Sequence, residues 1–552
     1  MEASARSFRR LTGADRLGDS PIPVRVIGLL RVRRYGDGVA TLIVAPAAPP
    51  EDEVRPALRT ESNLQAAPAS GRPTKKADQF AQAMVLVVLF AAPALMCVHA
   101  AVASDLDIWW HLRTGEWILQ HHALPRVDSF SGPLAGKPWA AYSWLFELLS
   151  IQLFQRFGLV GIVGYSAGMV LAITVALQHL IKRLQPDFSV VALLTFATCF
   201  SLEHLFKPRP WAFTVLFFVL EIDILMHARK TGRTRELAWL PVIFALWSNL
   251  HIQFIDGLVV LGIALAEAVL VRWNIGVRTR LRAPWLLAAA FAGSVIGTMA
   301  NPSGWHIYRV AYDLAAQAGV MDKISELQAM RFRDLSDFCL LFLALASAAA
   351  LAWSRRFRLF EAGLLVFASV VSFRSLRDVW VMATVSAAIL ASTIVGREKA
   401  AVRLPRFATA LAVLGVALAV LAGFRMMHVN NAQLQSQVAS SLPVRAVEVI
   451  RAKGYAGPLY NDFNWGGYLI WSLRMPVSID GRAAFYGDKS IDRSVATWNA
   501  EPDWAADPAL QSAGLVVGPA QSPLTQLLRV APGFTLVFED KVAAVFVANK
   551  QR

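Results

Sequence analysis

Long apolar stretches, separated by short polar segments, fill most of this chain between residues 81 and 425. About 20 apolar residues in helical conformation are enough to cross the hydrocarbon core of a bilayer. The pattern therefore predicts about eleven membrane-spanning helices, at residues 81–103, 158–181, 188–206, 211–227, 238–252, 254–271, 284–300, 337–353, 359–373, 379–395 and 407–425.

One further apolar segment, residues 140–157, is less regular. It contains Glu147, Gln152, Gln155 and Arg156 among its apolar residues. A helix that lies at the membrane surface has such a mixture of residues. We interpret the segment as an interfacial helix, and a twelfth span is the alternative.

The two ends of the chain have other patterns. Residues 1–80 are rich in Pro, Ala and Arg without a sustained period, which predicts a disordered cytoplasmic tail; a start codon assigned too far upstream is the alternative. Residues 426–552 predict a small α/β domain that follows the membrane domain of residues 81–425. Its expected helix is 443–453, and its expected strands are 458–460, 477–479, 515–517, 534–538 and 542–547.

Composition excludes a soluble protein. Of the 552 residues 56% are hydrophobic and 17% are charged, and the mean hydropathy is +0.46, whereas about a quarter of a soluble domain is charged.

The net charge of +15 comes without a basic helix or a basic patch interleaved with aromatic residues, so nucleic acid is not an expected partner. Cys97, Cys199 and Cys339 lie in apolar runs, and we expect packed thiols.

The distribution of Lys and Arg predicts the orientation. With the N-terminus in the cytoplasm, the cytoplasmic loops hold 17 Lys and Arg in 46 residues, and the opposite loops hold 11 in 89. Cytoplasmic loops of membrane proteins carry such an excess. Eleven spans then place the C-terminal domain outside the cytoplasm.

The first outer loop, residues 104–139, carries the strongest candidate chemistry. Asp105 and Asp107 stand at the outer end of the first span, and His111 follows Asp107 by four residues, which places the two on one helical face. Carboxylates at this boundary act as general bases or bind a divalent cation, Mg²⁺ or Mn²⁺. The structural alternative is that Asp105 only caps the helix and that the Trp residues nearby, Trp109, Trp110 and Trp117, anchor it at headgroup level.

Basic residues at outer helix ends go against the charge distribution and form a second candidate group. They are Lys207, Arg209, Arg374 and Arg377. Lys and Arg at these positions bind phosphate, Arg with two parallel hydrogen bonds, and the alternative is contact with ordinary lipid headgroups. Polar residues at the same depth, Asn249 and His251, are expected to line an outer-facing cavity.

Four motifs carry a resemblance to a known group. The first outer loop reads Asp-x-Asp-x-Trp-x-His-x-x-x-Gly-Glu at 105–116 and Leu-Pro-x-x-Asp-x-Phe-Ser at 124–131. The C-terminal region reads Asn-Asp-x-x-Trp-Gly-Gly-Tyr-Leu-Ile-Trp at 461–471 and Ile-Asp-Gly-Arg at 479–482. From about residue 81 to its end, the chain resembles bacterial multi-pass proteins related to the GT-C membrane glycosyltransferases.

The resemblance implies a function. GT-C enzymes take a sugar from a polyprenyl- or dolichyl-phosphate carrier, with an Asp of the first outer loop as base or metal ligand. By position, Asp105 or Asp107 carries over to that role, with His111 beside them, and the four basic residues above carry over to the phosphate. The resemblance thus implies an inner-membrane enzyme whose partners are membrane lipids, a polyprenyl-phosphate-linked sugar and a glycan or protein acceptor.

One departure keeps a second hypothesis open. The loop has Asp-Leu-Asp followed by Trp-Trp-His in place of the commoner Asp-Glu pair of GT-C enzymes. The second hypothesis is a non-catalytic membrane protein for lipid-linked glycan binding, transport or envelope assembly.

Overall fold

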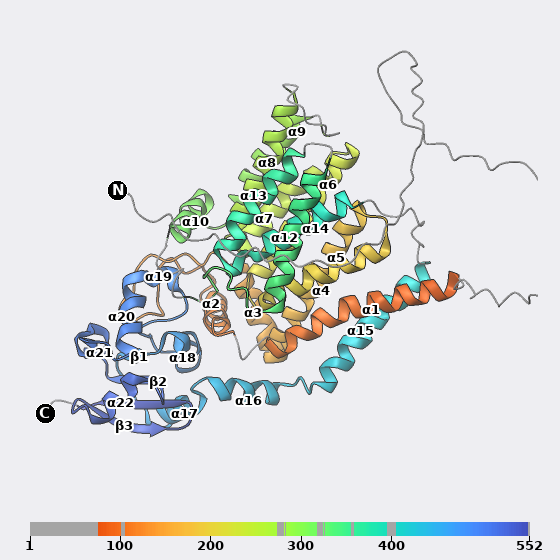
Figure 1. Ribbon diagram of the computed structural model, residues 1–552. Coiled ribbons are helices and arrows are strands. Elements are labelled where there is room, and N and C mark those ends of the chain that lie inside the picture. Colours follow the sequence, from red (N-terminus) through yellow and green to blue (C-terminus); the bar gives the residue numbers. More distant parts are fainter. Residues whose placement is uncertain are drawn as a thin grey trace, which may run out of the picture. The chain divides into compact units, whose positions relative to one another are not determined.

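The computed structural model describes residues 75–100, 105–272, 281, 283–316, 324, 326–354, 358–394 and 405–549 (Figure 1). The tail predicted for residues 1–80 lies outside the described residues up to residue 74. The first helix, α1, already begins at Lys75. Its predicted span is therefore preceded by about one and a half further helical turns.

Each of the eleven apolar stretches contains a helix. These helices are α1 (Lys75–Ala100), α4 (Leu159–Leu184), α5 (Phe188–Ser201), α6 (Trp211–Thr231), α7 (Leu240–Leu250), α8 (Phe254–Arg272), α9 (Pro284–Thr298), α12 (Leu335–Trp353), α13 (Leu359–Arg374), α14 (Val379–Thr393) and α15 (Arg406–Met426). Among the described residues, seven helices are long and apolar enough to cross a membrane: α1, α4, α6, α8, α12, α14 together with the short helix before it, and α15. The predicted class, an α-helical multi-pass protein, is confirmed.

Small residues let some of these helices approach closely. A Cβ at Gly297 of α9 would lie 2.5 Å from the carbonyl oxygen of Pro241 in α7, and one at Gly293 would lie 3.0 Å from the Pro241 ring. Two helices packed at this separation rely on glycine, as is common for helices within membranes. Helices α1 and α15 form another pair and lie side by side (Figure 1).

Shorter helices connect and flank the long ones. Two of them, α2 (Ile108–His121) and α3 (Trp144–Phe157), follow α1, and α3 is the helix expected within residues 140–157. The others in this part of the chain are α10 (Ile307–Ala315), η1 (Glu203–Leu205), η2 (Arg235–Trp239), η3 (Gly304–His306) and η4 (Leu376–Asp378).

The C-terminal region contains a four-stranded sheet in the order β1-β2-β4-β3. Strand β1 (Leu459–Asn461) pairs in parallel with β2 (Leu515–Pro519), which pairs antiparallel with β4 (Ala543–Ala548); β4 pairs antiparallel with β3 (Phe534–Glu539). The helices of this region are α16 (Asn431–Ser441), α17 (Val444–Lys453), η5 (Phe463–Trp465), α18 (Gly466–Leu473), α19 (Ala483–Tyr486), α20 (Asp488–Trp498), η6 (Trp504–Ala506), α21 (Pro508–Gln511) and α22 (Pro523–Val530). The expected α/β character is confirmed.

The expected strand at residues 477–479 is wrong. Val477 makes only isolated bridges, one to Leu459 and one to Ser131 of the first outer loop. Its N–H donates to the carbonyl of Phe130 at 2.9 Å, and its carbonyl accepts from Gly132 at 2.9 Å. Both of these hydrogen bonds go to the loop, more than 340 residues earlier, and a local pattern cannot reveal them.

Candidate functional site

Arg209 joins the two carboxylates of the first outer loop. Its Nε lies 2.7 Å from Oδ1 of Asp105, and its Nη1 donates to Oδ2 of Asp107. The side chain of Asp105 is fully buried, whereas that of Asp107 is 19% exposed. The structure therefore brings together one residue from the predicted phosphate-binding group and both predicted carboxylates.

Local sequence fixes the backbone on both sides of this cluster. Arg209 stands between Pro208 and Pro210, whose rings restrict φ, and its carbonyl accepts the Tyr165 hydroxyl at 3.0 Å. On the other side, Oδ1 of Asp105 accepts the N–H of Asp107 at 3.1 Å, just before α2 begins. Asp105 therefore closes a turn just before α2 but does not cap the helix, whose N-cap residue is Asp107 without a side-chain cap hydrogen bond.

The buried cluster contains two carboxylates, those of Asp105 and Asp107, and one guanidinium, that of Arg209. Burial raises the pKa of Asp105 to about 7, against the opposing charge of Arg209, and burial also raises the pKa of Asp107. For Arg209, burial lowers the pKa, but Asp105 and Asp107 outweigh it and raise the pKa above its usual value. Two carboxylates that share one guanidinium leave an acceptor for a proton near neutral pH.

Glu326 is a member of the site that the sequence analysis missed. It lies between α10 and α12, and its Oε1 accepts from Nζ of Lys207 at 2.9 Å. Burial alone would raise the pKa of Glu326, but Arg209, Lys207 and Arg377 lower it. The carboxylate thus faces three of the four basic residues that the sequence assigned to a phosphate. No motif marks Glu326, so only the fold reveals it.

Arg377 is held beside Glu326 by the backbone. Its N–H, within η4, donates to the carbonyl of Glu326 at 2.8 Å. Arg374 is exposed at the end of α13. Its assignment to the phosphate stays a prediction.

His111 points to a different partner from the one expected. Its Nδ1 lies 3.3 Å from Oε1 of Glu147 in α3, and both side chains are buried. Burial lowers the pKa of His111 well below its ordinary value. The side chain of Asp107 pairs with Arg209 instead. The i, i+4 spacing of Asp107 and His111 gives only a backbone hydrogen bond, in which the N–H of His111 donates to the carbonyl of Asp107 at 3.3 Å.

Trp109 and Trp110 do not lie at the surface of α2, as headgroup anchors would, whereas Trp117 is half-buried. Trp109 and Trp110 are 4% and 7% exposed. Trp109 packs edge-on against Tyr468 of α18, with 5.1 Å between ring centroids. Their rings therefore fill the protein core.

Asn249 and His251 are engaged within the protein. The side-chain oxygen of Asn249 accepts from Nε1 of Trp144 at 2.8 Å, and its amide donates to Ala245 and Ala300. Nδ1 of His251 lies 2.8 Å from Oγ1 of Thr214. Their roles in substrate binding stay predictions.

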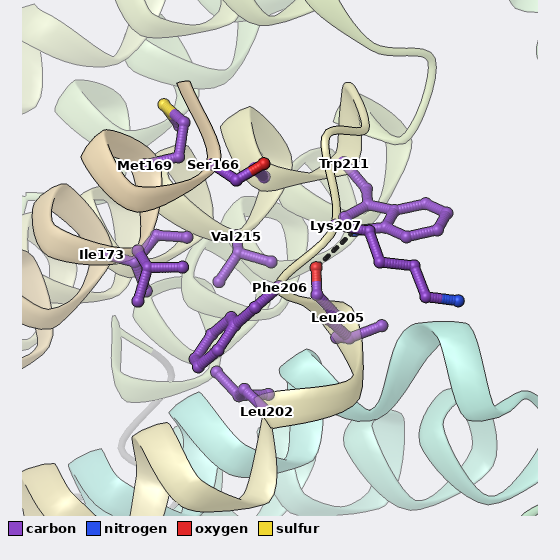
Figure 2. Close-up of a pocket in the computed structure, with 11 residues that line it drawn as sticks. Ser166, Met169, Ile173, Leu202, Leu205, Phe206, Lys207, Trp211 and Val215 are labelled. Atoms are coloured by element: carbon purple, nitrogen blue, oxygen red, sulfur yellow. Dashed lines mark hydrogen bonds between the residues drawn. The ribbon is translucent and has the colours of Figure 1, made fainter. Parts of the chain in front are cut away.

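A small apolar pocket of about 10 Å³, room for about one water molecule, is lined by α4, by the residues that follow α5 including η1, and by the start of α6. Figure 2 shows Met169 and Ile173 on one side and Trp211 on the other, with the Lys207 ammonium pointing away from the apolar side chains. The indole N–H of Trp211 donates to the carbonyl of Leu205 at 3.0 Å. Lys207 therefore lines the apolar pocket, and its ammonium pairs with Glu326 of the charged cluster.

The arrangement around Asp105 and Asp107 does not fit a divalent cation. The guanidinium of Arg209 contacts one oxygen of each carboxylate and takes the place between them where a cation would bind. In the described part of the chain, no group of three or more His, Cys, Asp or Glu side chains has the geometry of a metal site.

Motifs of the C-terminal region contact the first outer loop. Arg482 forms ion pairs with Asp480 at 2.7 Å and with Asp128 at 2.6 Å, and all three side chains are at most 3% exposed. The Ile-Asp-Gly-Arg motif thus forms a buried ionic contact with the Leu-Pro-x-x-Asp-x-Phe-Ser motif of the first outer loop.

Comparisons with known proteins give structural neighbours only. No family model matches the chain, and no curated protein matches it. The apo oligosaccharyltransferase of Archaeoglobus fulgidus matches at 12% identity and a TM-score of 0.48, over 81% of this chain and 70% of that one. ArnT of Cupriavidus metallidurans bound to undecaprenyl phosphate matches at 13% identity and a TM-score of 0.48, over 86% and 99%.

The apo state of the same ArnT matches at 14% identity and a TM-score of 0.35, over 84% of this chain and 99% of that one. These neighbours are GT-C glycosyltransferases, the kind of protein that the sequence resembles. At these scores the likeness carries no argument about individual residues. The roles proposed below rest on this chain's own side chains.

Proposed function

We propose that the protein is a GT-C-type membrane glycosyltransferase that moves a sugar from a polyprenyl-phosphate carrier to an acceptor outside the cytoplasm. One observation carries the proposal. Arg209 contacts both loop carboxylates, and Lys207, two residues earlier, lies beside apolar side chains of α4 and α6. A lipid phosphate needs cations for its head and an apolar surface for its chain, and an acceptor hydroxyl needs a base.

Asp107 is the better candidate for the base. Its side chain is 19% exposed, whereas that of Asp105 is fully buried. In the proposed step, the acceptor hydroxyl gives its proton to Asp107 while its oxygen bonds to the anomeric carbon. The bond from that carbon to the phosphate oxygen breaks, and the lipid phosphate leaves with both electrons. Lys207 and Arg209 stabilise its negative charge.

In this proposal the carboxylate of Glu326 occupies the position that the donor phosphate takes when it binds. It already pairs with Lys207 and lies in the field of Arg209 and Arg377. A donor phosphate that binds to these cations displaces the carboxylate of Glu326. The same cations therefore serve the protein's own carboxylate before donor binding and the phosphate after it.

The test is sugar transfer in membranes that contain Asp107→Asn. Membranes are supplied with a polyprenyl-phosphate sugar labelled in the sugar, and label in the acceptor fraction is measured. We expect transfer to fall by about 10²–10⁴-fold, the usual contribution of a general base. The control is Asp187→Asn, because Asp187 caps α5 through its side chain and Asn caps equally well. Transfer by Asp107→Asn at the wild-type rate would refute the mechanism.

A non-catalytic role is the second candidate, and one observation favours it. The predicted base is already bonded to Arg209, and the backbone of Gly481 packs against its other oxygen. In that case the purified protein binds a polyprenyl-phosphate sugar and releases it unchanged. Release of free polyprenyl phosphate by purified protein with an acceptor would exclude this candidate.

A further inference from the structure

Gly481 packs against the carboxylate of Asp107 without room for a side chain. A Cβ placed on Gly481 would overlap Oδ1 of Asp107 and lie 2.8 Å from its Cγ. Oδ2 of the same carboxylate bonds to Arg209. Oδ2 of Asp107 thus bonds to Arg209, and Oδ1 contacts the backbone of Gly481. The carboxylate is therefore held between the segment before α6 and the C-terminal region.

The residues on either side of Gly481 hold it in place. Oδ1 of Asp480 accepts from the backbone N–H of Arg482 at 2.9 Å and from its Nε at 2.8 Å, and Oδ2 accepts from Nη2 at 2.7 Å. The Tyr486 hydroxyl donates to the same Oδ2 at 2.7 Å. The buried turn is therefore closed by side chains on both sides of the glycine.

Aromatic rings surround the guanidinium of Arg482. Its Cζ lies 4.7 Å from the ring centroid of Trp139, 5.0 Å from that of Phe485 and 5.3 Å from that of Phe130. Two of these rings belong to the first outer loop. Attraction between a buried guanidinium and aromatic faces adds to the ion pairs, so the turn is fixed to the same loop that carries Asp107.

The preceding glycine pair brings a second segment to the loop. A Cβ at Gly467 would lie 3.1 Å from the carbonyl oxygen of Leu106 and 3.4 Å from the N of Trp110. Gly466 packs as closely on the turn itself, because a Cβ there would overlap the carbonyl oxygen of Ile479. The Gly-Gly and Asp-Gly-Arg motifs thus form one surface against residues 106–110.

We propose that the Asp480-Gly481-Arg482 turn is the positioning element for Asp107: it fixes the orientation of the carboxylate so that one oxygen stays on Arg209. This inference rests on the proposed function, in which Asp107 is the base. It names Gly481 and Arg482 as positioning residues that do not contact the reacting atoms.

The experiment combines a stability cycle with a pH profile. Gly481→Ala, Asp107→Ala and the double variant are purified in detergent, and their thermal unfolding is compared with that of wild type. The extra methyl group of Gly481→Ala clashes with the Asp107 carboxylate, and Asp107→Ala removes that carboxylate. We therefore expect the double variant to unfold at a higher temperature than the sum of the two single shifts predicts.

The activity arm measures transfer against pH for Gly481→Ala. We expect at least a tenfold loss at neutral pH and an upward shift of the pH midpoint, because Asp107 moves away from Arg209. The other titratable groups around Asp107 are the carboxylates of Asp105, Glu326 and Asp480 and the hydroxyl of Tyr142. If Gly481→Ala only reduced the amount of folded protein, the transfer rate would fall at every pH and the pH midpoint of transfer would not change.

The matched control is Gly533→Ala, since a Cβ at Gly533 has no atom within 4 Å. It should behave as wild type in both arms. Additive stability shifts, or an unchanged midpoint in active Gly481→Ala, would overturn the inference. Failure of the proposed function is distinct: Asp107→Asn would then transfer sugar as wild type does, whatever the cycle shows.

Discussion

Arg482 and Asp128 lie 354 residues apart in the chain and form a buried ion pair, with 2.6 Å between Nη1 and Oδ1. Asp128 also accepts from the backbone N–H of Ser131 at 2.8 Å, which shapes the loop around it. The first outer loop and the C-terminal region are thus linked by charge as well as by the backbone bridge at Val477.

The first prediction concerns this pair. Arg482→Gln leaves Asp128 and Asp480 buried without a cation, and removing one partner of a buried ion pair costs about 3–5 kcal/mol. We expect a clear fall in the thermal transition in detergent. Arg529→Gln removes an exposed pair with Glu539 and should change the transition little. Equal transitions for wild type and Arg482→Gln would contradict the structural role of the pair.

The second prediction separates charge from shape at Arg209. Arg209→Lys keeps one positive charge, but an ammonium cannot reach two carboxylates in the planar fork geometry of a guanidinium. We expect transfer to fall by about tenfold or more, with weaker binding of the lipid donor. Donor titration against initial rate provides the measurement, and Arg529→Lys is the control. Wild-type kinetics for Arg209→Lys would show that the double contact is unimportant.

The third prediction follows from Glu326. Glu326→Gln removes the anion that competes with a donor phosphate for Lys207 and Arg209. The variant should therefore bind polyprenyl phosphate several-fold more tightly, which equilibrium binding in detergent micelles can measure. Glu501→Gln, at an exposed position of the C-terminal region, serves as the control. Weaker binding by Glu326→Gln would mean that the carboxylate orders the site for the phosphate.

The fourth prediction is a pH dependence of stability. Burial raises the pKa of Asp105 from 3.8 to about 7. Between these values the folded chain holds a proton that the unfolded chain has released, so the free energy of unfolding falls as pH rises through this window. Asp105→Asn removes this contribution.

We therefore expect the wild-type transition temperature to fall from pH 4 to pH 7 by more than that of Asp105→Asn. The comparison with the variant cancels other groups that titrate in the same range. Parallel curves for the two proteins would show that Asp105 titrates as it does in the unfolded chain.

Local pattern predicted the helices well, because burial in a bilayer demands long apolar runs and each expected run contains a helix. It also singled out Asp105, Asp107 and Arg209, whose side chains the structure brings into contact, while their roles stay proposals. It failed at Val477, whose backbone hydrogen bonds go to Phe130 and Gly132, and at Glu326, whose loop has no motif. Both failures concern partners set by tertiary contacts, which one sequence does not record.

The buried pair of Asp128 and Arg482 also has a consequence for biosynthesis. A ribosome adds about 5–20 residues per second, so roughly 20 to 70 s pass between the synthesis of Asp128 and that of Arg482. During this interval the first outer loop lacks the turn that contacts Asp107. The carboxylate site is therefore complete only after the C-terminal region has been synthesised.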